Sequence, residues 1–145
     1  MLRLFVDANT LVSGVAYDGN EAGLLAYARL GTCELVTVEH VHQEVRDVLR
    51  EPRLGLLPRE RGNALHLLAR HVHVLDDPTA KELGRARGRI RDPKDIPVLV
   101  GFEQSGCDYL VTGDRDLRGV VPKAISTKRA LALLQRLVES AEPES

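Results

Sequence analysis

The chain has 145 residues, of which 43% are hydrophobic and 28% are charged, and its formal net charge is −1. These values fit one globular domain that buries its own core, expected over residues 1–139, with a disordered tail at 140–145. A near-neutral chain lacks the overall positive charge of most nucleic-acid-binding proteins, so any polyanion contact must come from local basic patches. The sequence shows no repeat and no second domain.

No apolar run approaches the ~20 residues that a membrane-spanning helix needs, and Asp7 interrupts any pattern typical of a signal peptide. We therefore expect a cytoplasmic protein with no membrane contact. Cys33 and Cys107 stand alone, outside the spacings of zinc or disulfide motifs, which favours two buried, reduced thiols.

Short apolar runs alternate with helical patterns along the whole chain. Strands are expected at residues 2–6, 35–38, 72–75, 109–112 and 124–126. Helices are expected at residues 21–30, 39–50, 59–71, 79–89, 96–106 and 127–138, and the glycines at 14 and 19 predict a loop before the first of them. Continuous apolar strands that alternate with helices predict an α/β fold with a parallel sheet covered on both faces.

Aspartates follow two of the predicted strands directly. Asp7 comes after LRLFV, and Asp114 comes after YLVTG, with Asp116 two residues later. Sites in open α/β sheets form beyond the carboxyl ends of the strands, so these side chains converge if the two strands are neighbours. Two unit charges ~4 Å apart repel by roughly 4 kcal/mol at an effective dielectric constant of 20. A divalent cation such as Mg²⁺ or Mn²⁺ would relieve that repulsion, whereas a single such aspartate could equally be a turn former or helix cap.

Three further carboxylates join this set. Glu44 lies beside the apolar stripe of the 39–50 helix, where it could bind a metal or instead reach solvent or a nearby arginine. Asp92 and Asp95 bracket the turn in DPKDIPVL, and Asp95 could also cap the helix that follows. Acidic residues at the ends of so many elements are typical of a phosphodiesterase that uses one or two metal ions.

Short polar and basic residues surround these acids. Asn9, Ser13 and Thr112 could orient the carboxylates or a metal-bound water, or be ordinary loop and cap residues. Arg89, Arg91, Lys94 and Arg115 could position phosphates, although basic runs are often only solvated helix faces. Few aromatic residues are present to stack on unpaired bases.

The five histidines, at positions 40, 42, 66, 71 and 73, predict a zinc site only weakly. His40 and Glu44 are four residues apart on one predicted helix, but the sequence has no H-E-x-x-H motif. Surface or boundary positions are the ordinary expectation for them.

The sequence resembles the PIN-domain family, and within it the branch of toxins from toxin–antitoxin pairs. The resemblance rests on FVDANTLVSG at residues 5–14, on Glu44, and on DPKDIPVLVGFEQSGCDYLVTGDRDL at residues 92–117. The similarity spans roughly residues 1–135. It implies a three-layer α/β/α fold with strand order 3-2-1-4-5, RNA cleavage with Mg²⁺ or Mn²⁺, and often a homodimer. The metal-binding and catalytic acids implied by position are Asp7, Glu44, Asp95 and Asp114, supported by Asp92 and Asp116.

Two departures from the family pattern stand out: DAN replaces the commoner D-T-N, and no serine begins the helix that carries Glu44.

The expected function is that of an endoribonuclease in which water attacks the phosphate in line and no covalent enzyme intermediate forms. A cognate antitoxin could insert a peptide near the cleft. The alternative from another class is a non-catalytic PIN-like module that binds RNA or protein. A haloacid-dehalogenase-type phosphatase would need an acid where Asn9 stands, and a receiver domain would need its aspartate on a middle strand and a lysine after a late one.

Overall fold

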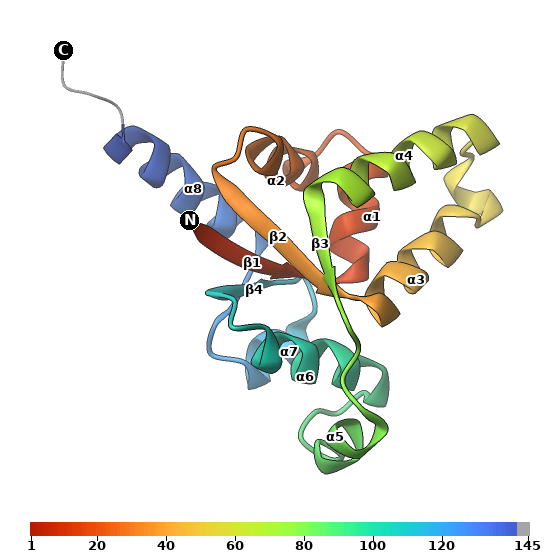
Figure 1. Cartoon of the computed structure of the whole chain (residues 1–145), viewed down its shortest axis with the longest axis vertical. Helices are drawn as coiled ribbons and strands as arrows, with labels where there is room; N and C mark the ends of the chain where they lie inside the picture. The colour runs from red at the N-terminus through yellow and green to blue at the C-terminus, as the bar shows by residue number, and fades with distance from the viewer. Residues whose placement is uncertain (142–145) are drawn as a thin grey trace.

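The computed structural model describes residues 1–141. Five parallel strands form one sheet in the order β3-β2-β1-β4-β5 (Figure 1). The strands are β1 Leu2–Val6, β2 Cys33–Val38, β3 Val72–Leu75, β4 Tyr109–Val111 and β5 Ala124–Ile125. Both the parallel α/β class and the strand order 3-2-1-4-5 predicted from the sequence are confirmed.

Helices cover both faces of this sheet and complete the three-layer α/β/α architecture. They are α1 Ala8–Ala16, α2 Asn20–Arg29, α3 Glu39–Leu49, α4 Pro58–His71, α5 Ala80–Arg85, α6 Ile96–Ser105, α7 Arg115–Val120 and α8 Thr127–Ala141, with 3₁₀ turns η1 Pro52–Leu54 and η2 Pro93–Asp95. Helices α1 to α4 and α8 pack with one another on one face, whereas α5 and α6 pack together on the other (Figure 1). No helix within residues 1–141 is long and apolar enough to cross a membrane.

The first helix occupies a segment that the sequence predicted as a loop. Gly14 lies inside α1, and a Cβ atom at this position would approach the Leu25 side chain of α2 to 2.8 Å. The glycine therefore permits close packing of two helices and does not make a turn. Helix α7 was also missed, because the apolar pattern after Asp114 is too short to show a helical period.

The ends of helices α5 and α8 also differ from the sequence prediction. Helix α5 ends at Arg85 and does not continue to residue 89, and Gly88 adopts a left-handed backbone with φ of 80° that ends the helical path. Helix α8 includes residues 140 and 141, which had been assigned to the tail, while 142–145 lie outside the described residues.

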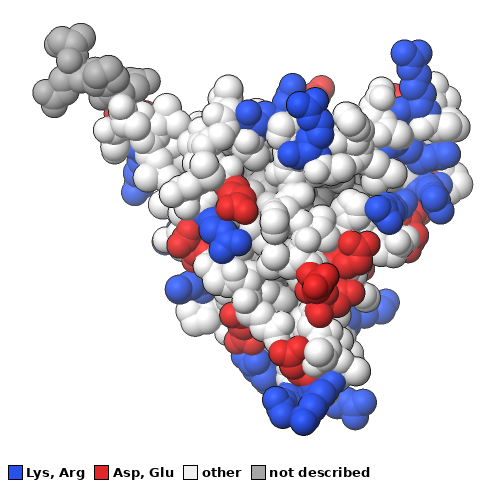
Figure 2. Space-filling view, viewed as in Figure 1, with Lys and Arg blue, Asp and Glu red and all other residues white. Residues whose placement is uncertain are grey.

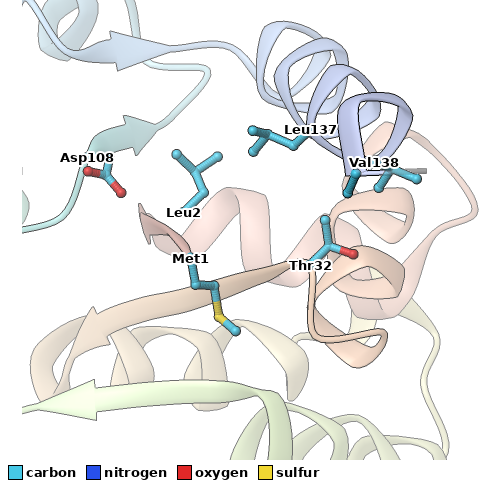
Figure 3. A pocket seen from close by; sticks show the side chains of 7 residues that line it. Met1, Leu2, Thr32, Asp108, Leu137 and Val138 are labelled. Atoms are coloured by element: carbon cyan, nitrogen blue, oxygen red, sulfur yellow. The ribbon is translucent and has the colours of Figure 1, made fainter. Parts of the chain in front are cut away.

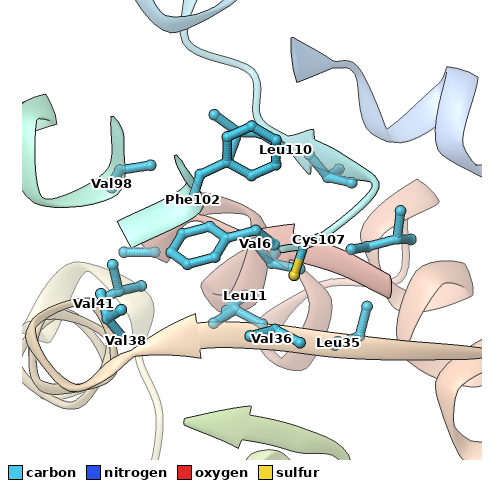
Figure 4. Close-up of a cluster of buried hydrophobic side chains, with 14 of the residues drawn as sticks. Val6, Leu11, Leu35, Val36, Val38, Val41, Val98, Phe102, Cys107 and Leu110 are labelled. Atoms are coloured by element: carbon cyan, nitrogen blue, oxygen red, sulfur yellow. The ribbon is translucent and has the colours of Figure 1, made fainter. Parts of the chain in front are cut away.

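The core lies on both sides of β1, the central strand (Figure 4). Leu4, Phe5 and Val6 are all fully buried, which explains why this strand is a continuous apolar run. Phe5 packs edge-to-face against Phe102 of α6, with ring centroids 6.2 Å apart. Both cysteines are buried and free, as predicted, and burial raises the pKa of the Cys33 thiol to about 11.

Helix α6 approaches the sheet most closely at Gly101. A Cβ atom there would lie 3.1 Å from Cγ1 of Val38 and 3.2 Å from Cζ of Phe5, and both of those side chains are buried. The neighbours therefore have little room to move.

We predict that Gly101→Ala lowers the free energy of unfolding by about 1–3 kcal/mol, because overpacking outweighs the higher helix propensity of alanine. Gly62→Ala in α4 is the matched control, since nothing lies within 4 Å of a Cβ atom there. It should raise the free energy of unfolding by about 0.5–1 kcal/mol. Urea unfolding measures both, and stabilisation by both substitutions would contradict the tight packing of α6.

Candidate active site

Strands β1 and β4 bring two segments far apart in sequence into direct contact. Val6 pairs with Val111 in the register of these parallel strands, so the next residues, Asp7 and Thr112, leave the sheet side by side. Thr112 is fully buried and Asp7 is only 8% exposed. A buried carboxylate is costly unless it is hydrogen-bonded or paired with a cation.

Hydrogen bonds fix the Asp7 carboxylate from two sides. Its Oδ1 accepts from the backbone N–H of Thr10 at 3.0 Å and so caps α1, while its Oδ2 accepts from the Thr112 hydroxyl. The same hydroxyl oxygen accepts from the backbone N–H of Asp114 at 3.0 Å. Thr112 therefore ties the end of β1 to the start of the turn after β4, an orienting position of the kind proposed from the sequence.

Asp114 caps α7 and turns Asp116 back toward the sheet edge. Oδ1 of Asp114 accepts from the N–H groups of Asp116 at 2.8 Å and Leu117 at 3.1 Å. Among residues 1–141, no hydrogen bond is made to its Oδ2. One oxygen therefore holds the local fold and the other is available to a ligand.

Asp95 enters from the other side, at the end of η2 and the start of α6. Its carboxylate makes no capping hydrogen bond to α6, and Pro97 removes one of the amide donors that a cap would use. Oδ2 of Asp95 is buried without a hydrogen-bond partner in the described residues. Carboxylate oxygens of Asp95, Asp114 and Asp116 lie within 4.8 Å of one another.

This proximity changes the protonation of Asp95. Burial raises its pKa to about 6, and the negative charges of Asp114, Asp92, Asp116 and Asp7 add to the effect, in that order. Arg91 lies 3.2 Å from Oδ2 of Asp116, but its side chain is 87% exposed and compensates little of this charge. An unpartnered buried oxygen among clustered carboxylates fits a hard divalent cation such as Mg²⁺ or Mn²⁺.

A cleft of about 280 Å³ gathers most of the acids predicted from the sequence. Its lining includes Asp7, Asn9, Glu44, Asp92, Lys94, Asp95 and Asp114. Glu44 and Asp92 are exposed at its rim, so the Glu44 side chain both reaches solvent and lines the cleft. Ser13 does not line the cleft.

The basic residues predicted to contact phosphate differ in their availability. Lys94 lines the cleft, and Arg115 is exposed at the start of α7. Arg89 is a poor candidate, because its two terminal nitrogens each donate to a carboxylate oxygen of Glu103 at 2.7 Å. Such a bidentate pair holds the guanidinium away from other anions.

The histidines lie outside the acidic cluster. His42 is buried, although the sequence suggested a surface or boundary position, and neither ring nitrogen has a hydrogen-bond partner within residues 1–141. Burial, followed by the charge of Arg46, lowers the pKa of His42 and keeps the ring neutral. His40 is exposed, and the one group of possible metal ligands found among the described residues contains no histidine.

A larger pocket, of about 790 Å³, lies elsewhere, between the start of β1 and helix α8 (Figure 3). Its walls are mainly apolar and include Met1, Leu2 and Leu137. Its one carboxylate, Asp108, already accepts from the backbone N–H of Arg3 at 2.8 Å. The one group of possible metal ligands among residues 1–141 lies at the other end of the strands.

Comparison with known proteins gives three findings. The family model of the PIN domain matches residues 3–116. Among solved structures, PAE2754 from Pyrobaculum aerophilum is similar with a TM-score of 0.73 and 25% identity, over 93% of this chain and 96% of that one. VapC20 (Rv2549c) from Mycobacterium tuberculosis, a sarcin-ricin loop cleaving toxin, is similar with a TM-score of 0.59 and 22% identity, over 81% of this chain and 95% of that one. No curated protein matches the sequence.

We predict that Asp95→Asn stabilises the metal-free protein at about pH 7.5 by roughly 1–2 kcal/mol, because the amide removes a charge that the fold disfavours. The pKa of Asp95 is about 6 in the folded state against an ordinary 3.8, so the charge destabilises the fold above pH 6. This destabilisation disappears as the pH falls through 6 toward 3.8, and the difference between wild type and variant should shrink in parallel.

Urea unfolding in EDTA across this pH range provides the measurement. Asp18→Asn is the control, because Asp18 is an exposed aspartate outside the cleft and should change little. If Asp95→Asn destabilised the metal-free protein at neutral pH, the account of repulsion in the cluster would be wrong.

Proposed function

The chain belongs to the PIN-domain family, and we propose that it is an endoribonuclease that depends on Mg²⁺ or Mn²⁺. This is a family of hydrolytic nucleases. The observation that carries the proposal is the cluster of Asp95, Asp114 and Asp116 within 4.8 Å, which includes a buried oxygen without a partner. The cleft alone does not distinguish RNA from other phosphodiesters, so RNA as the substrate is supported by family membership.

The residues of the cleft have distinct roles in this proposal. Asp95, Asp114 and Asp116 would hold the cation together with Asp7, and Glu44 and Asp92 would contribute from the rim. When bound, the cation supplies charge neutralisation at the phosphate and a lowered pKa for a coordinated water. Thr112 is a positioning residue, because its hydroxyl fixes the orientation of Asp7.

Phosphate positioning falls to the basic residues nearest the cleft. Lys94 lines it, and the exposed Arg91, which pairs with Asp116, can reach a phosphate oxygen beside the acids. Arg115 follows Asp114 directly and is exposed, so it can reach a phosphate at the same edge. Asn9, on the opposite wall, can donate a hydrogen bond to the substrate or to water.

The toxin role is part of the proposal. VapC20, a structural neighbour, is a sarcin-ricin loop cleaving toxin, which supports a role as the toxin of a toxin–antitoxin pair. A cognate antitoxin would then cover the acidic cleft, and a peptide that offers arginine would match its charge. We also propose a cytoplasmic location, as expected from the sequence, and a homodimer, which the resemblance to this branch of the family implies.

We predict that the purified protein cleaves RNA in Mn²⁺ or Mg²⁺ and that Asp7→Asn reduces the rate by about 100-fold or more, because one of the carboxylates that would hold the cation is lost. Thr112→Val should reduce it by about 10–100-fold, because the hydroxyl that orients Asp7 is removed. Thr37→Val is the matched control, since this buried hydroxyl donates to the carbonyl of Val6 at 2.9 Å and does not touch a carboxylate.

Gel analysis of labelled RNA measures these rates. Thr37→Val should retain the wild-type rate when its folded fraction is taken into account. Equal cleavage by wild type and Asp7→Asn would sink the nuclease assignment.

A non-catalytic PIN-like module that binds RNA or protein is the second candidate, and metal binding tests it. We predict that Mn²⁺ raises the melting temperature of the wild type, by an amount that grows with the logarithm of its concentration above Kd. Asp95→Asn and Asp114→Asn should lose most of this shift, whereas Asp18→Asn should keep it. If the melting temperature of the wild type did not change with Mn²⁺, the result would favour the non-catalytic module.

A further inference from the structure

We propose that a second groove, between α5 and the segment that leads into α6, binds an unpaired nucleotide of the RNA next to the phosphate that is cut. This inference rests on the proposed function and extends it, because it assigns a binding site to residues outside the acidic cleft. The groove is lined by Leu83, Gly84, Arg87, Ile90, Arg91 and Pro93, together with neighbouring small and apolar residues.

The shape of the groove suits a nucleotide. Its volume of about 590 Å³ falls within the roughly 300–1,000 Å³ typical of small-ligand sites. Its floor is apolar, with Ile90 only 5% exposed, and the prolines beside it present rigid carbon surfaces. No carboxylate of residues 1–141 lines it, in contrast to the acidic cleft.

The charge around the groove favours a polyanion. Residues 81–91 contain five Lys or Arg side chains and one Glu, in a chain whose net charge is −1. Figure 2 shows this basic side-chain cluster at the tip of the molecule that α5 forms in Figure 1. Glu103 pairs with Arg89, but among residues 1–141 no carboxylate forms an ion pair with Arg87, which lines the groove.

The groove and the acidic cleft lie on either side of the segment 91–97, which contributes residues to both linings. Arg91 lines the groove and forms an ion pair with Asp116 of the carboxylate cluster. Pro93 lines the groove in the 3₁₀ turn that also contains Asp95. A strand whose base lies in the groove would therefore carry its next phosphate past Arg91 to the clustered carboxylates.

The occupant is an unpaired nucleotide because the contacts are made to the face of a base. A base within a duplex is stacked on both faces and cannot enter, whereas single-stranded RNA presents its bases freely. No aromatic residue lines the groove, so Leu83, Ile90 and Pro93 would provide apolar contact in place of stacking. Arg87 and Arg91 would bind the flanking phosphates.

The first test fills the groove. Gly84 lies in α5 with nothing within 4 Å of a Cβ atom, so Gly84→Phe should fold and place its ring in or over the groove. Fluorescence anisotropy of a labelled single-stranded oligoribonucleotide in EDTA should show Kd raised about fivefold or more. Gly62→Phe is the matched control, because Gly62 is an equally open helical glycine in α4, and its Kd should equal that of wild type.

The second test removes charge. Arg87→Ala should raise Kd for the same oligoribonucleotide and reduce the slope of log Kd against log salt by about 0.7, the value for one lost phosphate contact on single-stranded nucleic acid. Arg136→Ala on the exposed part of α8 is the control and should change neither quantity. A fully base-paired RNA should bind less tightly than the single strand, and Gly84→Phe should not weaken its binding further.

These experiments separate the groove from the proposed nuclease activity, because binding is measured without metal and without cleavage. If wild type cleaves RNA but Gly84→Phe and Arg87→Ala bind the single strand as wild type does, the groove inference is overturned and the nuclease proposal stands. If wild type does not cleave in Mn²⁺ but both variants lose binding, the groove stands and the nuclease proposal falls. If the variants lose binding of a polyglutamate peptide but not of RNA, the groove takes an acidic protein segment and the inference is overturned.

Discussion

Carboxylates that repel one another gather at the carboxyl ends of the strands, and the arrangement of the acidic cleft depends on how this repulsion is relieved. The pairing of β1 with β4 forces Asp7 to emerge beside Thr112, and the turn after β4 adds Asp114 and Asp116. Hydrogen bonds satisfy only part of this set, since one oxygen of Asp95 stays buried and unpartnered. The fold tolerates the unfavourable charge because the apolar core beneath it is continuous on both faces of the sheet.

One short turn serves two purposes in the proposed mechanism. Residues 92–97 carry Asp92 and Asp95 toward the acidic cleft and Pro93 and Ile96 toward the apolar groove. Proline at the start of α6 restricts the backbone of this turn, so the two surfaces keep a fixed spacing. A substrate that spans both would be positioned by the turn itself, which is how orientation contributes to catalysis.

The strand order was implied by the resemblance to the PIN-domain family. The strands themselves and most acids of the cleft could be predicted from the sequence, because continuous apolar runs and the acids that follow them are local signals. Helix α1 could not, since Gly14 resembles a turn signal until the side chain of Leu25 is known to pack against it. The exposure of Glu44 and the engagement of Arg89 by Glu103 depend on residues distant in sequence. The burial of His42 could not be predicted either, because it depends on the elements that cover the side chain in the folded chain.

The hydrogen bond between Thr112 and Asp7 joins residues 105 positions apart, and this separation has a consequence for the order of folding. The contact between β1 and β2 spans a much shorter stretch of chain, so it can form before the distant β4 docks. Asp7 therefore joins Asp95, Asp114 and Asp116 only when β4 docks on β1, and the repulsion between Asp7 and these three acids opposes that step. An ion that neutralises these acids would therefore lower the unfolding rate of the assembled sheet more than it raises the folding rate.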